Sequence, residues 1–253
     1  MGHLNELNEK YAAKGLQVIA ITNEARGLVD KFVEETGATH PIVIESSDSA
    51  TAWGISGFPS MFVVGPDGTI LHKGIPSDQQ IEKWLEDAKP FPQAPRSLSK
   101  VVDAIADMEL SGALKDLEKF LAKEGQPEEE VAAAREIQEW VLWRASSGLE
   151  GAAKAAASGD VYRAAKTYRE LAAWFKGHET ADTAETALKE LLSDKDRKRE
   201  IDAGEKLDQA REKARDLSKN KAIKLYESIA KRYEGTRAAE EAQRIVTRLE
   251  NQR

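Results

Sequence analysis

The sequence predicts an α/β domain followed by an all-α domain. Up to about residue 90, short runs of β-branched and apolar residues alternate with helical patterns, which is typical of an α/β sheet. After residue 96, Ala, Leu, Glu, Lys and Arg dominate, and Pro127 is the single proline left. Between the two lies "KPFPQAPR", whose three prolines cannot continue a helix. We therefore expect an α/β domain at 1–89, a proline-rich linker at 90–96 and a helical domain at 97–253.

The N-terminal part divides into segments of alternating type. The opening "MGHLNELNEKYAAKG" is predicted to be an amphipathic helix, and it lacks the basic start and apolar centre of a secretory signal. Strands are expected at 16–21 (LQVIAI), 41–45 (PIVIE), 60–64 (SMFVV) and 69–74 (TILHKG), and further helices at about 25–35 and 77–88.

The stretch from Gly57 to Gly68 carries the strongest local signals. "GPDG" at 65–68 is turn chemistry between two strand-sized apolar runs, so it predicts a β-hairpin. Pro59 stands directly before the strand at 60–64, where a cis bond is compatible with a tight turn.

The order and spacing of these segments resemble the redoxin branch of the thioredoxin superfamily, meaning the TlpA-like thiol-disulfide oxidoreductases and their peroxiredoxin relatives. The resemblance covers about residues 3 to 89, and its most specific part is the pattern G-x-P-S/T-x-F-x-x-x-x-x-G at Gly57–Gly68. It implies a cis bond at Pro59 and a peptide-binding loop of Gly57, Phe58, Pro59 and Ser60, in which the backbone of Phe58 pairs with an extended substrate.

The same resemblance also implies parts that this chain lacks. Family members begin with a strand and a C-x-x-C turn, whereas this chain has no cysteine and begins inside the helix that follows them. The missing strand would lie in the middle of the sheet, between those at 16–21 and 60–64. Three interpretations are open: the chain is a fragment of a longer protein, which we favour; the remaining strands pair directly in a smaller sheet; or another chain donates the strand.

No other catalytic, metal or cofactor site is expected. The four histidines, His3, His40, His72 and His178, have no metal-ligand spacing and are expected in loops or at the surface. There is no nucleophile elbow, Walker loop or dinucleotide fingerprint. Trp53 and Ile55, which match positions leading into the family's loop, are expected to serve ordinary core packing.

The C-terminal part contains an internal similarity. Residues 161–191 and 219–249 align at an offset of 58, which places Tyr168 on Tyr226 and Gly177 on Gly235. Each unit predicts two helices joined by a glycine turn and resembles a tetratricopeptide (TPR-like) hairpin, although the full signature is not met. A long polar helix at about 194–217 separates the units, and 111–125 is a candidate third. A plain helical bundle and a peptide-binding solenoid remain equally open, and Trp140, Trp143 and Trp174 are expected to be core or interdomain anchors.

Charge limits the classes of partner. Residues 1–95 hold 7 Lys and Arg against 13 Asp and Glu, and the whole chain has a net charge of −7, so nucleic acid is not expected as a partner. No apolar run is long enough to cross a membrane. We expect polypeptide partners and possible oligomers through exposed sheet edges. A periplasmic or cell-envelope location is implied by the resemblance alone.

Two functions compete. The first is a thiol-disulfide oxidoreductase of the redoxin type with a helical protein-interaction domain, of which this chain is a redox-inactive piece because it has no cysteine. The second is a genuinely cysteine-less thioredoxin-like scaffold or adaptor that binds polypeptides.

Overall fold

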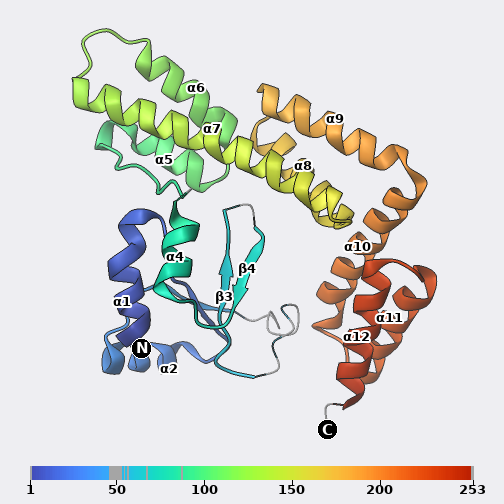
Figure 1. Ribbon diagram of the computed structural model, residues 1–253. Coiled ribbons are helices and arrows are strands. Elements are labelled where there is room, and N and C mark those ends of the chain that lie inside the picture. Colours follow the sequence, from blue (N-terminus) through green and yellow to red (C-terminus); the bar gives the residue numbers. More distant parts are fainter. Residues whose placement is uncertain are drawn as a thin grey trace. The chain divides into compact units, whose positions relative to one another are not determined.

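A computed structural model describes residues 2–45, 53, 55, 57–66, 68–86 and 88–251 (Figure 1). The chain divides into two compact units, the first formed by Met1–Gly65 and Thr69–Pro92 and the second mainly by Gln93–Arg253. The linker expected at 90–96 stays a prediction. Within the described residues, none of the helices has the length and apolar character needed to span a bilayer.

The first unit alternates helices and strands. In order these are α1 (Gly2–Tyr11), a 3-10 turn at Ala12–Lys14, β1 (Ala20–Thr22), α2 (Arg26–Thr36), β2 (Ile42–Ile44), β3 (Phe62–Val64), β4 (Ile70–Lys73) and α4 (Asp78–Leu85). β1 pairs in parallel with β2, with Ala20 opposite Ile42. β3 pairs antiparallel with β4, with Phe62 opposite Lys73. The predicted alternation of strands and helices is therefore present.

The predicted hairpin is confirmed between β3 and β4. The Gly65 N–H donates to the carbonyl of Thr69 at 2.8 Å, and Gly68 has a φ of 76°, a value that glycine adopts without steric cost. Asp67 of the predicted turn lies outside the described residues. The Phe58–Pro59 bond is cis, as expected.

A small core joins α1 to α4. Leu7 and Tyr11 on α1 are buried against Ile81 on α4, because apolar residues at these spacings form one face of each helix. Helix α4 begins at Ser77 in a capping box, in which the Ser77 side chain accepts from the Gln80 N–H and the Gln80 side chain accepts from the Ser77 N–H.

One expectation about the strands is wrong for the described residues, and one of the three open interpretations is not found there. The strand predicted at 16–21 forms only at Ala20–Thr22, because a strand needs a ladder partner, while Leu16 and Val18 pack instead against the α1–α4 core. The smaller joined sheet is also absent from the described part of the chain. There β1 pairs only with β2 and β3 only with β4, so two short two-stranded sheets are present.

The second unit is helical throughout its described residues. Its elements are a 3-10 turn at Arg96–Leu98, α5 (Ser99–Ala106), α6 (Leu110–Leu121), α7 (Glu128–Ala157), α8 (Val161–Trp174), α9 (Glu179–Ser193), α10 (Lys195–Ala214), α11 (Lys219–Arg232) and α12 (Arg237–Asn251). Trp140 and Trp174 are partly buried against the core cluster that includes α7, α8 and α9, so both contribute to packing.

The hairpins α8–α9 and α11–α12 have bounds that correspond at the offset of 58 residues. Tyr168 and Tyr226 are both buried, and Gly177 and Gly235 both adopt left-handed turns, with φ of 81° and 84°. Helix α10 contributes to the core on each side of it: Ile201 joins the α7–α9 cluster, and its later apolar residues join the α11–α12 cluster. The long polar helix that separates the two units in the sequence is therefore part of the packing.

Candidate functional site

The loop Gly57–Ser60 precedes β3 and carries the family-implied peptide-binding residues. The Ser60 hydroxyl donates to the carbonyl of Gly57 at 2.7 Å, which closes the loop on itself. All four residues are exposed, and the Phe58 side chain is 78% exposed, an unusual state for a large apolar group. The loop therefore presents its apolar residue outward.

The backbone of Phe58 has free hydrogen-bonding groups. Within the described part of the chain, neither its N–H nor its carbonyl forms a hydrogen bond. Beyond the loop, β3 pairs only with β4 among the described strands, so its other edge lacks a ladder partner there. Unpaired backbone groups of this kind can pair with an extended chain in the manner of an added strand.

Trp53 packs near the loop but is not part of a buried core. Its ring meets that of Phe62 edge to face, with centroids 5.1 Å apart, and Lys73 Nζ lies 5.5 Å from the Phe62 ring centroid. Trp53 remains 42% exposed. The core packing expected for Trp53 is therefore not found, and its ring packs on Phe62 at the surface. Ile55 is half-buried.

His40 lies in a loop, one of the two places expected for the histidines, but it is buried. It lies just before β2 but is only 4% exposed. Asn5 on α1 explains its burial, because the Asn5 amide donates to the Gly37 carbonyl, its oxygen accepts from the Thr39 N–H, and it lies 3.3 Å from His40 Nδ1. Among the described residues, no group of three His, Asp or Glu side chains is arranged to hold a metal ion.

The shifted pKa values belong to structural contacts away from the loop. A hydrogen bond to Asp78 raises the pKa of Lys10, which lies 2.6 Å away, and the same contact lowers that of Asp78. Hydrogen bonds from the backbone of Arg197 and Asp196 lower the pKa of Asp194, the cap of α10.

The exposed loop Gly57–Ser60 can offer backbone pairing and an apolar contact. The chain has no thiol for nucleophilic chemistry.

Comparison with known proteins finds relatives that are named thiol-disulfide oxidoreductases. The chain is 32% identical over 94 residues to proteins named thiol-disulfide oxidoreductase ResA from Geobacillus thermodenitrificans (strain NG80-2) and Geobacillus kaustophilus (strain HTA426). It is 29% identical over 94 residues to the protein of that name from Bacillus anthracis. Each match covers 36% of this chain and 54% of the relative, so the chain spans about half the length of the curated relatives it matches. No family model and no solved structure matches. These similarities support a thioredoxin-like domain in this chain.

Proposed function

We propose that this chain serves thiol-disulfide exchange by holding an extended polypeptide against the loop Gly57–Ser60, with the reacting thiols supplied by cysteines that the chain does not contain. The observation that carries the proposal is the unpaired backbone of Phe58 beside an exposed phenyl ring. The similarity to oxidoreductases supports the redox context. The helical part would recruit protein partners, as TPR-like hairpins do.

The absence of cysteine defines what the chain does by itself. Exchange proceeds through attack of a thiolate on a disulfide and a mixed-disulfide intermediate, which needs a sulfur atom on the enzyme. We therefore expect that the chain does not accelerate the reduction of insulin by dithiothreitol. In a turbidity assay, the rate with the chain should equal that of a buffer blank. Turnover above that blank in a preparation free of other oxidoreductases would contradict this expectation.

Binding at the loop is tested by NMR with an unfolded client. The probe is ribonuclease A that has been reduced and carbamidomethylated, so that it is extended and has no reactive thiol. We expect saturable shifts of the amide signals of Gly57, Phe58 and Ser60, and none with native ribonuclease A. Shifts confined to other parts of the chain would refute the assignment of the loop.

A pair of matched variants distinguishes specific binding at the loop from nonspecific hydrophobic binding. Phe58→Ala removes the exposed ring, and we expect about fivefold weaker binding, which corresponds to about 1 kcal/mol. Leu28→Ala on α2 removes a side chain that is also exposed, at 58%, and should leave the affinity unchanged. Equal losses in both variants would indicate nonspecific hydrophobic contact.

The alternative function, a cysteine-less scaffold without a redox role, predicts the same binding but different clients. A photo-crosslinking residue in place of Phe58 would capture polypeptides at the loop, since that side chain is exposed. The oxidoreductase proposal predicts that the captured polypeptides are enriched in disulfide-bonded cysteines. A captured set with ordinary cysteine content would favour the scaffold.

Self-association through sheet edges belongs to the same proposal. Among the described strands, β1 and β3 each have a ladder partner on one side only, and Ile21 on β1 is 53% exposed. Such edges pair with other chains. We expect a concentration-dependent dimer by sedimentation velocity that Ile21→Lys weakens; a monomer at all concentrations would remove edge pairing from the proposal.

A further inference from the structure

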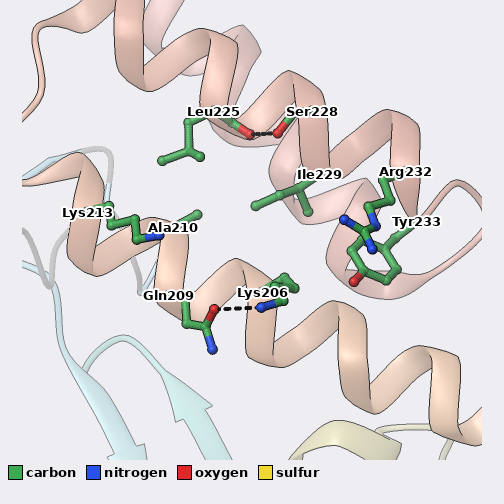
Figure 2. Close-up of a pocket in the computed structure, with 9 residues that line it drawn as sticks. All are labelled: Lys206, Gln209, Ala210, Lys213, Leu225, Ser228, Ile229, Arg232 and Tyr233. Atoms are coloured by element: carbon green, nitrogen blue, oxygen red, sulfur yellow. Dashed lines mark hydrogen bonds between the residues drawn. The ribbon is translucent and has the colours of Figure 1, made fainter.

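A groove runs between α10 and α11 in the helical unit (Figure 2). Its walls come from residues spaced three or four apart on each helix, which places them on one face. On α10 these begin at Lys206 and end at Lys213, and on α11 they run from Leu225 to Arg232. The groove encloses about 170 Å³.

The floor of the groove is apolar. Ala210 is 2% exposed, and its short side chain leaves room between the helices, while Ile229 and Tyr233 belong to the core beneath. Leu225 contributes a further, half-buried apolar surface. The Ser228 hydroxyl donates to the carbonyl of Leu225 at 2.6 Å, so its hydrogen is directed to its own helix. An apolar side chain that entered this space would remove its surface from water, which is favourable in free energy.

The rim carries three cations and no carboxylate. Lys206, Lys213 and Arg232 line the groove, and none of them forms an ion pair within the described part of the chain. Lys206 donates only to the neutral oxygen of Gln209, at 3.0 Å, and the guanidinium carbon of Arg232 lies 5.6 Å from the Tyr233 ring centroid.

Two cations near the groove are arranged differently. Arg211 on α10 pairs with Asp208 at 3.1 Å and with Glu241 at 3.6 Å, and Arg215, just after α10, pairs with Glu212 at 2.8 Å. The cations of the groove form no such pair in the described part of the chain, and neither do those at the start of α10, from Lys195 to Arg199. A rim of one charge over an apolar floor is complementary to an anionic, partly apolar ligand.

We propose that this groove binds a short acidic peptide segment of a partner protein, with one large apolar side chain on the floor and flanking carboxylates facing Lys206, Lys213 and Arg232. The volume fits one such side chain, because an engineered cavity of about 150 Å³ accommodates benzene. The segment is short because the groove is bounded by the two lysines of α10, which are seven residues apart. The binding surface is separate from the loop Gly57–Ser60.

The test is fluorescence anisotropy of the full chain with a labelled peptide, Asp-Asp-Glu-Phe-Glu-Asp-Asp. We expect saturable binding that weakens as salt is raised, because the rim charges are exposed and screened. Two further peptides dissect the recognition: replacing Phe by Ala, or all acids by Lys, should each weaken binding at least fivefold. Equal binding of the Phe and Ala peptides would overturn the role of the floor.

Matched charge reversals locate the site on the chain. Lys206→Glu and Lys213→Glu should each weaken peptide binding by about three- to tenfold at low salt. Lys224→Glu changes the net charge by the same amount on an exposed position of α11 outside the groove and should leave binding nearly unchanged. All these positions are exposed, so the variants should fold, and circular dichroism checks this.

Three outcomes would overturn the proposal. Equal weakening by Lys206→Glu and Lys224→Glu would mean a general charge effect. If single-stranded RNA of the same charge displaces the labelled peptide as effectively as the unlabelled Phe peptide does, the groove binds polyanions in general. A dimer that is lost in Lys206→Glu would mean that a second copy of the chain occupies the groove. Phe58→Ala should not affect the peptide, which distinguishes failure here from failure of the loop.

Discussion

Gly204 in α10 lies beneath the ring of Tyr162 from α8, and a side chain there would meet it directly. A Cβ at position 204 would be 2.2 Å from Tyr162 Cγ and 2.4 Å from its Cδ1. The ring cannot move aside freely, because the Tyr162 hydroxyl donates to Asp208 Oδ2 at 2.6 Å, one turn further along α10. Burial and this hydrogen bond hold the pKa of Tyr162 above its ordinary value, so the hydroxyl is protonated at neutral pH and can donate.

Gly204→Ala sets two effects of opposite sign against each other. Alanine is favoured over glycine inside a helix by about 1 kcal/mol. Overpacking of a close helix contact costs about 1–3 kcal/mol, and loss of a hydrogen bond to a charged acceptor costs about 1.5–3 kcal/mol. Since the ring must shift to admit the methyl group, we expect a net loss of about 1.5–5 kcal/mol in the free energy of unfolding of the helical unit.

The assay is urea unfolding followed by circular dichroism at 222 nm. Gly112→Ala in α6 is the matched control, because no atom lies within 4 Å of its Cβ position, and it should stabilise by up to about 1 kcal/mol. The double variant Tyr162→Ala, Gly204→Ala should lose less than the sum of its single changes, because the clash is then absent. The reasoning is refuted if Gly204→Ala is as stable as Gly112→Ala.

Three further expectations concern helix caps and the linker. Ser77→Ala should destabilise the first unit by about 1 kcal/mol, because the Ser77 side chain caps α4. Ser218→Ala at the start of α11 should have little effect, since that serine makes no capping hydrogen bond. Hydrogen exchange of the two helices checks both. The folded pKa of Asp194 is depressed, so its capping contribution to stability is present above the unfolded pKa and is lost as pH falls through the folded pKa. After correction for intrinsic exchange, hydrogen exchange of the amides at the start of α10 should therefore rise in acid in the parent chain. In Asp194→Asn it should be independent of pH. Proteinase K, a protease of broad specificity, should at limiting amounts cut first within Lys89–Arg96, and protection of this segment would contradict a linker there.

Local signals in the sequence predicted local structure well. The predicted turn at Gly65–Gly68 and the predicted helix from about residue 77 depend on residues only a few positions apart, and the structure adds the cap at Ser77. The hairpin and α4 were therefore predictable from a few residues each.

Features that depend on distant residues were not predictable. The length of β1 depends on its pairing with β2, some twenty residues away, so the apolar run at 16–21 overstated it. The burial of His40 depends on Asn5, 35 residues earlier. In both cases the decisive partner lies far along the chain, where periodicity and composition carry no information about contact.

The two candidate sites differ in how far the sequence could predict them. The loop at Phe58 was indicated by one continuous motif, and the structure adds its exposure and its unpaired backbone. The groove joins Lys206 and Lys213 to Arg232 on another helix, and no continuous pattern signals that combination. The spacing of the two lysines on one face was visible in the sequence, but their lack of carboxylate partners requires the packed structure.

The two units also differ in how they would respond to their ligands. Two-stranded sheets are marginal by themselves, and the first unit leaves Ile21 and Ile70 on its strands 53% exposed, whereas the second has core clusters linked through α10. A ligand that binds only the folded state stabilises by RT ln(1 + [L]/Kd), about 2.7 kcal/mol at a hundredfold excess over Kd. Because each unit has its own core, an extended client at Phe58 should slow hydrogen exchange in β3 and β4, and an acidic peptide should slow it in α10 and α11. Each ligand therefore reports on its own site within one chain, and protection that appears in the wrong unit would reassign that ligand.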